Sequence, residues 1–288
     1  MFDAVVDQLA RKAEETLAGK RTFTDSEGFR HCVVCGDRIE TLLTGRDGAP
    51  LFGGRKVVCT CSCDRKRQEW EARERAERDS LERVRTMLRE CSLYDPAYRQ
   101  YTFAKDQHDK DPDFAYAAKK CRDYVTHFAA LEQEHAGLLL TGPVGTGKSF
   151  YAAAVVNALC DKGIPAIIFP TARLINAVKA TRDPQALFDE LDGFSLVALD
   201  DLGAERDTEF ALEQLENFVD QRALKGKVLL VTTNLSIQEI RNPRDLRYRR
   251  LFDRIQALCC LPVPLIHQSL RSAQAAAQEA KCRSILGY

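Results

Sequence analysis

The sequence predicts an α/β protein whose main part is a five-stranded parallel sheet covered by helices on both faces. A smaller N-terminal part with a cysteine cluster precedes it. Five short apolar runs alternate with helical stretches in the second half of the chain, a pattern typical of a buried parallel sheet. A glycine-rich loop, GPVGTGKS, follows the first of these runs. Five cysteines lie within residues 32–63.

The composition is that of an ordinary globular protein large enough for one sizeable core and a smaller part. The chain has 288 residues, of which 45% are hydrophobic and 29% charged, and its formal net charge is zero. This balance argues against a protein coated in basic residues for non-specific nucleic-acid binding. The N-terminus lacks the continuous apolar run of a signal peptide, and no run of about eighteen apolar residues occurs elsewhere, so we expect a cytoplasmic protein.

The N-terminal part is expected to span residues 1–90 and to reach the main part, residues 113–288, through a linker over 91–112. Apolar spacing predicts a short amphipathic helix over 2–18. The cysteine-bearing segment over 31–63 has too few apolar residues to fold on a core alone. A charged helix over 64–90 follows, in which Leu81, Val84 and Leu88 form one apolar stripe. The linker is polar and broken by Pro96 and Pro112.

The main part alternates helices and strands in a regular order. We expect helices over 114–131, 149–160, 171–180, around Leu187 and over 209–224, and strands over 137–141, 166–170, 195–201, 227–234 and 258–264. About twenty-four residues follow Pro264, enough for one helix but not for a full helical lid.

The glycine-rich loop matches G-x-x-x-x-G-K-[ST] completely and stands between a predicted strand and a predicted helix, the context that this motif requires. Its backbone N–H groups and the start of the helix would face phosphate groups. Lys148 would reach the β- and γ-phosphates, and the Ser149 hydroxyl would ligate Mg²⁺. The expected nucleotide contacts in this loop are Gly142, Pro143, Val144, Gly145, Thr146, Gly147, Lys148, Ser149 and Phe150.

Two adjacent acids, Asp200 and Asp201, end the apolar run LVAL, at the sheet edge where ligands bind in α/β proteins. Phosphoryl transfer needs one acid to hold the metal and one group to position the attacking water. We assign Asp200 to the metal and Asp201 to the water. The alternative is that both acids cap a turn, although adjacent acids after a buried strand are costly unless they are paired or ligating.

The cysteine cluster reads Cys32-Val-Val-Cys35, followed after a loop by Cys59-Thr-Cys61-Ser-Cys63. Four thiolates suit a closed, structural Zn²⁺ site, so five cysteines compete for four positions. Cys32 and Cys35 are expected ligands, with two of the other three, Cys61 foremost. Buried thiols, a redox switch, an iron–sulfur cluster or ligation by the neighbouring histidine, His31, remain alternatives.

The ordered set GPVGTGKS, LVALDDLGAE, LLVTTNLS, RRLFDR and QSLR resembles the DnaC/IstB-like branch of the AAA+ ATPases, over about Tyr98 to Gln274. The resemblance implies that Asn234 is the polar sensor and that Arg254 is an arginine finger acting on a neighbouring subunit's nucleotide. Arg250 would be a second basic contact, and Arg271 the second sensor. Arginines stabilise charge on phosphate oxygens, but a plain basic surface helix or a DNA contact is the alternative for each.

This branch contains loaders of the replicative DNA helicase and helper ATPases of transposons. The resemblance implies ATP, Mg²⁺ and Zn²⁺ as cofactors, with a replicative helicase, single-stranded DNA and other copies of the chain as partners. A zinc-bearing N-terminal part favours the loader over the transposition helper. A small-molecule kinase is a third hypothesis, but it leaves Asn234 and Arg254 without roles. Asp201 stands where many AAA+ enzymes have Glu, so slow hydrolysis is expected.

Overall fold

The computed structural model divides the chain into two compact units, Met1–Arg78 and Asp79–Tyr288. The division falls inside a long helix, not at either end of the expected linker. The expected helix over 2–18 lies outside the described residues. The structure describes residues 21–44, 48–50, 54, 56–108, 111–203, 208–243, 245–266 and 269–286.

The first unit contains two small antiparallel hairpins. Strand β1 (Thr22–Thr24) pairs with β2 (Arg30–Cys32), and β3 (Glu40–Leu42) pairs with β4 (Lys56–Val58). The buried cluster of this unit consists of Cys32, Ile39 and Cys61, with Cys35, Val58 and Cys63 packed against it. Among the described residues of this unit, the apolar core is small, and cores of this size usually need additional stabilisation.

Helix α2 (Ser62–Glu90) is the long charged helix that the sequence predicts. Ion pairs along it include Arg67–Glu71 at 3.7 Å and Glu82–Arg85 at 3.7 Å, both between largely exposed side chains. The last turns of the helix belong to the second unit, where Val84 and Leu88 are buried in the main core. The predicted apolar stripe therefore docks the C-terminal end of α2.

The second unit contains the predicted five-stranded parallel sheet, in the order β6-β7-β8-β5-β9. Nearly all residues of the four strands other than β9 are buried, as expected for apolar runs covered on both faces. Pairing is in register from Leu138↔Leu230 to Thr141↔Thr233 between β5 and β8. The strands are β5 (Leu138–Thr141), β6 (Ala166–Pro170), β7 (Leu196–Leu202), β8 (Val228–Thr233) and β9 (Leu261–Pro264).

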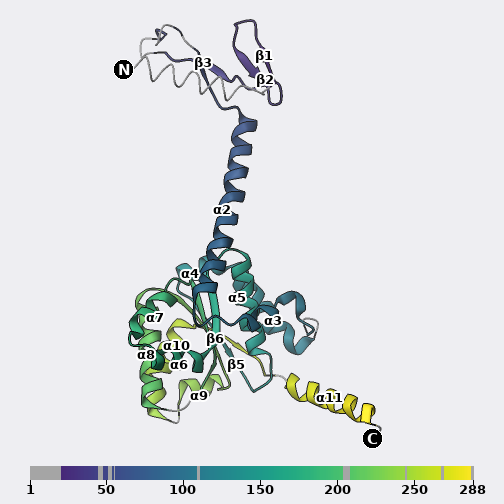
Figure 1. Cartoon of the computed structure of the whole chain (residues 1–288), viewed down its shortest axis with the longest axis vertical. Helices are drawn as coiled ribbons and strands as arrows, with labels where there is room; N and C mark the ends of the chain where they lie inside the picture. The colour runs from purple at the N-terminus through teal and green to yellow at the C-terminus, as the bar shows by residue number, and fades with distance from the viewer. Residues whose placement is uncertain are drawn as a thin grey trace. The chain divides into compact units, whose positions relative to one another are not determined.

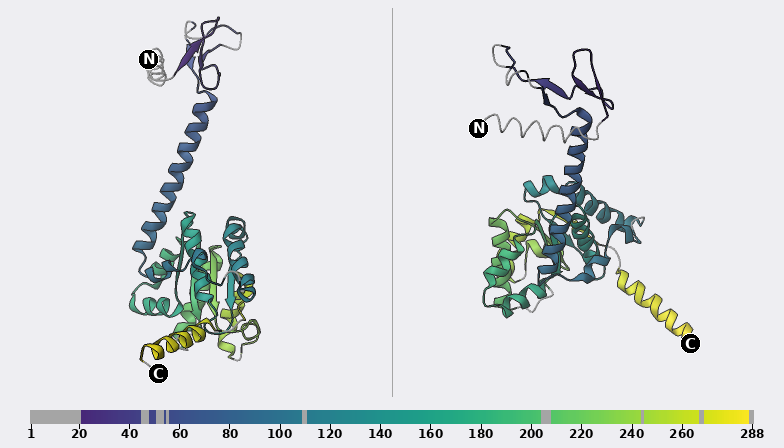
Figure 2. Two further views of the ribbon diagram at one scale, coloured as in Figure 1. Left: turned by 90° about the vertical axis from the view of Figure 1, so that its right-hand side faces the viewer. Right: turned by 45° about the horizontal axis from the view of Figure 1, so that its top comes forward.

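Helices flank this sheet on both sides (Figures 1 and 2). Helix α5 packs across β5, β6, β7 and β8, and α3 lies beside it against β9. Helices α6, α8 and α10 pack together against the other face. No helix among the described segments is both long enough and apolar enough to cross a membrane. The helices are α3 (Pro112–Thr126), α4 (Phe128–Gln133), α5 (Lys148–Asp161), α6 (Thr171–Ala180), α7 (Pro184–Leu191), α8 (Glu209–Leu224), α9 (Ile237–Arg241), α10 (Arg249–Leu258) and α11 (Leu270–Leu286).

The helix expected over 114–131 is two helices, because the chain turns at His127. The backbone there leaves the helical region, at φ −103° and ψ 13°, and the His127 ring lies 2.9 Å from the Asp123 carbonyl. The periodicity of apolar residues continues across the break, so the sequence pattern alone predicted one helix.

The stretch expected as a linker packs closely onto the second unit. It contains two short 3₁₀ helices, η2 (Pro96–Gln100) and η3 (Phe103–Lys105). The aromatic residues Tyr98, Tyr101 and Phe103 lie against the main core. Buried Asn157 of α5 donates to the carbonyls of Tyr98, at 2.9 Å, and Tyr101, at 2.7 Å. Aromatic packing and these two hydrogen bonds hold the stretch beside the sheet.

Candidate functional site

The glycine-rich loop joins the end of β5 to the start of α5 in a conformation that needs its glycines. Gly142, Gly145 and Gly147 all have positive φ, at 144°, 83° and 87°. A side chain at Gly142 would place its Cβ 2.0 Å from the Leu265 carbonyl oxygen, so the loop runs against the backbone that follows β9. Gly147 caps α5, which leaves the first N–H groups of the helix directed at the loop.

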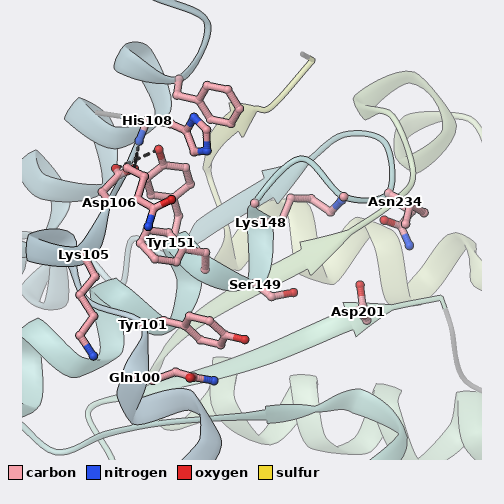
Figure 3. Close-up of a pocket in the computed structure, with 16 residues that line it drawn as sticks. Gln100, Tyr101, Lys105, Asp106, His108, Lys148, Ser149, Tyr151, Asp201 and Asn234 are labelled. Carbon is pink, nitrogen blue, oxygen red and sulfur yellow. Dashed lines mark hydrogen bonds between the residues drawn. The ribbon is translucent and has the colours of Figure 1, made fainter. Parts of the chain in front are cut away.

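A pocket of about 460 Å³ opens beside this loop (Figure 3). The loop, the end of β7, the residue that follows β8 and the 91–112 stretch all contribute lining residues, so the pocket combines segments far apart in the sequence. Such a polar cleft at the carboxyl end of a parallel sheet is the usual position of a ligand site. Lining residues include Val144, Gly145, Gly147, Lys148, Ser149, Phe150, Asp201 and Asn234 from the predicted site, and Gln100, Tyr101, Lys105, Asp106, His108 and Tyr151 from outside it.

Lys148 is buried, with 4% of its surface exposed, and its ammonium donates to the carbonyls of Gly142, at 2.8 Å, and Pro143, at 2.7 Å. Thr146 is also buried, and its hydroxyl donates to the Pro143 carbonyl at 2.9 Å. These bonds fix the curl of the loop from inside. The nucleotide contacts assigned to the loop from the sequence remain predictions, and the geometry is compatible with them.

Asp200 lies near the end of β7 and is 4% exposed. Its carboxylate accepts two hydrogen bonds, from the Thr232 hydroxyl at 2.6 Å and from the Tyr98 hydroxyl at 2.9 Å. A carboxylate has about four lone-pair positions, so two remain for a further partner. Hard oxygen donors of this kind fit Mg²⁺, but Asp200, unlike Asp201, is not among the residues that line the pocket. Burial and the Asp200 charge raise the pKa of Tyr98, so its hydroxyl stays a donor at neutral pH.

Asp201 differs from Asp200 because the pairing of β7 with β8 slips between Leu199 and Leu202. Asp201 takes a left-handed conformation, with φ 57°, and its N–H donates to the Thr232 hydroxyl at 2.9 Å. A left-handed residue other than glycine costs about 1–2 kcal/mol, and strain of this type clusters at functional sites. The irregularity places Asp201 on the wall of the pocket, which Asn234 also lines (Figure 3).

Asn234 follows the last residue of β8 and is exposed to the pocket. The Thr233 hydroxyl before it donates to the Leu202 carbonyl at 2.8 Å, which ties the ends of β7 and β8 together. The structure thus brings Lys148, Ser149, Asp201 and Asn234 around one cavity, an arrangement able to hold a phosphate group and a water molecule.

Two of the predicted arginines, Arg250 and Arg254, do not line this cavity. Arg254 on α10 is largely exposed, and its Nε lies 2.9 Å from an oxygen of Asp220 on α8. Arg250, four residues earlier, is exposed on the same helix. Arg271 belongs to α11, and its side chain lies outside the described part of the structure. Neither Arg250 nor Arg254 lines the pocket of its own chain.

The wall formed by residues 100–108 was not predicted from the sequence. Asp106 is the most enclosed charge on it, with 3% of its side chain exposed. It accepts a hydrogen bond of 3.1 Å from the Tyr151 hydroxyl and lies 4.0 Å from Arg122. Burial raises the pKa of Tyr151, so this hydroxyl is also a donor. The only sequence signal was the recurrence of aromatic residues in a stretch that otherwise resembled a linker.

The first unit gathers four of its cysteines. The sulfurs of Cys32, Cys35, Cys61 and Cys63 all lie within 4.8 Å of one another, with Cys61 and Cys63 at 3.2 Å and Cys32 and Cys63 at 3.5 Å. Tetrahedral Zn²⁺ with bonds of about 2.3 Å would separate its sulfurs by about 3.8 Å, so the set fits zinc. Cys59 is not part of this group.

His31 has other partners. Its Nε2 lies 2.7 Å from an Asp25 oxygen and its Nδ1 lies 3.0 Å from the Gly36 carbonyl oxygen. With both ring nitrogens engaged, the side chain serves to hold the loop around the cysteines and is poorly placed to be a ligand. The Gly36 carbonyl and Asp25 raise the pKa of His31.

Comparisons with known proteins agree with the fold. Residues 71–259 match the model of the family IstB-like ATP binding protein. The replicative helicase loader DnaC of Escherichia coli K12 is 26% identical over 145 residues, 49% of this chain and 57% of that protein. An ATP-binding protein in an insertion sequence of Mycobacterium tuberculosis is 26% identical over 151 residues, 51% of this chain and 60% of that protein. The chain thus matches less than two thirds of the length of either relative.

A crystal structure of the DnaC helicase loader aligns over 60% of this chain and 100% of that chain, with a TM-score of 0.50 and 26% identity. The AAA+ phosphate-loop fold and the cysteine cluster predicted from the sequence are therefore confirmed, the cluster as one compatible with a zinc module. The family model covers well over half of the chain, and the chain belongs to the IstB-like ATP-binding proteins.

Proposed function

We propose that this protein is an ATP-dependent loader of a replicative DNA helicase. The observation that carries the proposal is the pocket around Lys148, Asp201 and Asn234, in a fold that aligns with the whole of a DnaC loader structure. In this proposal the second unit binds ATP and single-stranded DNA, and the cysteine-bearing unit holds the helicase. The expected division into residues 1–90, 91–112 and 113–288 is part of the proposal.

We propose slow ATP hydrolysis to ADP and phosphate at this pocket. Lys148 would contact the phosphates, and Ser149 and Asp200 would hold Mg²⁺, which would neutralise charge on the phosphate oxygens. Asp201 and Asn234 both line the pocket and would orient the attacking water between them. Arg271 would contact the same nucleotide from α11.

The pocket lacks an arginine of its own chain close to the phosphate loop, within the part of the chain that is described. Arg254 is exposed on α10 and free of the cavity wall, so a neighbouring subunit could receive it. We therefore propose self-association through the second unit, with Arg254 completing the neighbour's site and Arg250 beside it. ATP binding would then control assembly on the helicase.

We propose that Cys32, Cys35, Cys61 and Cys63 hold structural Zn²⁺. Four sulfur ligands close the coordination sphere, so the metal would staple the unit and leave no open position for catalysis. The small core of this unit makes the staple necessary. The folded unit would present its surface to the helicase.

The proposal is tested by co-purification with the replicative helicase encoded in the same genome. Tagged protein should retain the helicase in the presence of ATP. The Lys148→Ala variant should retain the same amount of helicase with and without ATP. The control is Lys119→Ala, a change at a largely exposed lysine on α3. Absence of association in every nucleotide state would overturn the loader proposal.

An IstB-like transposition helper is the second candidate, because an insertion-sequence protein is as similar to this chain as DnaC is. In that case the partner is a transposase and not a helicase. Immobilised protein challenged with each partner separately distinguishes the two, and retention of only the transposase favours the helper.

A further inference from the structure

The stretch that was expected to be a linker makes a direct bond to the acid assigned to the metal. The hydroxyl of Tyr98 on η2 donates to Asp200 Oδ2 on β7 at 2.9 Å, across 102 positions of sequence. Both partners belong to the second unit. The bond is one of two that hold the Asp200 carboxylate, and the other comes from Thr232 on β8.

The two bonds reach different oxygens of the carboxylate. Thr232 donates to Oδ1 and Tyr98 to Oδ2, so together they fix the rotation of the Asp200 side chain. A single bond would leave the carboxylate able to rotate about its terminal torsion, which has a broad energy minimum. Both oxygens still have one lone-pair position for another partner. Tyr98 therefore orients the Asp200 carboxylate and leaves lone-pair positions on it for a metal ion.

Tyr98 is itself held in place, which makes its hydroxyl a fixed donor. Asn157 donates to the Tyr98 carbonyl at 2.9 Å. The Asp95 side chain caps η2 by accepting from the Ala97 N–H at 2.9 Å and lies 3.4 Å from Arg173. These contacts fasten η2 to α5 and α6, so the position of the hydroxyl is set by the fold.

The same short segment reaches the nucleotide pocket one turn later. Tyr101 lines the pocket and stacks edge-on against Phe150 of α5, with ring centroids 5.8 Å apart. Tyr98 and Tyr101 also contact each other edge-on, at 6.4 Å. The segment thus touches the cavity with one tyrosine and the buried acid with the other.

We propose that Tyr98 is a positioning residue for Asp200, and that its hydroxyl sets the affinity of the site for the divalent cation that accompanies ATP. This inference deepens the proposed function and rests on the assignment of Asp200 to the metal. Groups that orient a ligating carboxylate through a hydrogen bond are usually worth about 10–100-fold in metal affinity.

The test compares Tyr98→Phe with the unchanged protein. Phenylalanine keeps the ring packing and removes only the hydroxyl. The affinity of the ATP complex for Mn²⁺, measured by electron paramagnetic resonance, should fall by about 10-fold or more. The affinity for ATP in the presence of a chelator should stay within about twofold, because the phosphate loop is intact. These readouts do not require that the protein hydrolyses ATP.

The matched control is Tyr124→Phe, which removes a buried hydroxyl that donates to the Ala136 carbonyl at 3.0 Å, away from the pocket. It should leave the Mn²⁺ affinity unchanged. A second variant, Asp200→Asn, tests separately whether Asp200 binds the cation and whether Tyr98 positions Asp200. If Asp200→Asn weakens Mn²⁺ binding and Tyr98→Phe does not, the role of Tyr98 is overturned alone. If Asp200→Asn has no effect, the metal assignment falls, and the inference with it. If Tyr98→Phe lowers the affinity for ATP in the presence of a chelator as much as it lowers the affinity for Mn²⁺, the positioning role is also contradicted, because such a loss would indicate general disruption of the site.

Discussion

Two adjacent acids at the end of β7 are placed differently by one irregularity of the backbone. Asp200 is buried and held by two hydroxyls, whereas Asp201 is turned by its left-handed conformation onto the pocket wall. Asn and Asp adopt the left-handed conformation more readily than most other residues with a side chain. The different roles that we propose, Asp200 for the metal and Asp201 for the water, are based on this difference in local geometry.

Asp201→Asn tests the role of the second acid. Asparagine suits the same left-handed backbone but cannot accept a proton, so we expect ATP turnover to fall by about 10²–10⁴-fold. Affinity for ATP, measured by calorimetry, should change little, because the phosphate contacts assigned to Lys148 and Ser149 remain. Hydrolysis by the variant at the unchanged rate would contradict the assignment.

Cys59 and Cys61 offer a matched pair for the metal proposal. Only Cys61 belongs to the group of four sulfurs, although the two cysteines are separated by one residue. We expect Cys61→Ser to abolish the bound zinc and Cys59→Ser to retain it, as measured by elemental analysis of the purified protein. Equal zinc in both variants would show that Cys59 can replace Cys61 and that the geometry does not select the ligands.

The sequence predicted those lining residues of the pocket that belong to contiguous motifs at strand ends. Lys148, Ser149, Asp201 and Asn234 could be placed together because the carboxyl ends of parallel strands meet at one edge. Tyr98 and Asp106 could not, because their roles depend on contacts with segments far away in the chain. The choice among Cys59, Cys61 and Cys63 also needed the fold, since spacing allowed several sets.

Among the elements, α10 carries the prediction about assembly. Leu251, Phe252 and Ile255 are buried on one face, and the opposite face exposes Arg250 and Arg254. If Arg254 acts on a neighbour, the Arg254→Ala protein should lose turnover by about 10³-fold while still binding ATP. Mixing it with Lys148→Ala protein should restore hydrolysis, because one variant keeps the pocket and the other keeps the arginine.

The control for this mixture is Arg249→Ala, on the same helix and also exposed. It should hydrolyse ATP normally without a partner variant. A mixture of Arg254→Ala and Lys148→Ala that remains inactive would contradict action in trans, provided that the two proteins associate in gel filtration.

The amino ends of β7 and β8 depend on a fully buried arginine. Arg222 of α8 has no exposed surface and lies 3.6 Å from Asp192. Burial lowers its pKa to about 10. Its guanidinium donates to four backbone carbonyls, those of Leu191, Phe194, Ser195 and Val228.

Arg222→Met removes the guanidinium that donates to these four carbonyls and the positive charge beside Asp192. We expect the free energy of unfolding to fall by about 3–5 kcal/mol and the Tm to drop by roughly 10 °C. Exposed Arg182→Met should change the free energy by less than about 0.5 kcal/mol. Scanning calorimetry of both variants checks this, and an equal Tm for the two would contradict the structural role of Arg222.

The strands were predictable because runs such as LVAL and VLLV are short and apolar without interruption, which is typical of strands buried on both faces. The turn at His127 and the two 3₁₀ helices were not, because a local hydrogen bond and long-range aromatic packing override the sequence pattern there. The break between the two units also falls within a continuous helix, where composition gives no signal.

In the whole chain, the second unit is proposed to bind and hydrolyse ATP, and the first unit, with its four clustered cysteines, is proposed to hold a partner. Neither unit alone would perform the proposed function: the first has no phosphate loop, and the second lacks the clustered cysteines. The proposal therefore makes its strongest claim about the intact chain acting on a ring-shaped helicase.

The most direct measurement is loading of the replicative helicase onto circular single-stranded DNA, which offers no end for a closed ring to thread. DNA-bound helicase would be separated from free helicase by gel filtration and quantified. We expect the unchanged protein with ATP to raise the amount of DNA-bound helicase several-fold. The Lys148→Ala variant should give only the amount that binds when helicase is incubated with DNA alone. An unchanged amount of bound helicase with the intact protein and ATP would contradict the account.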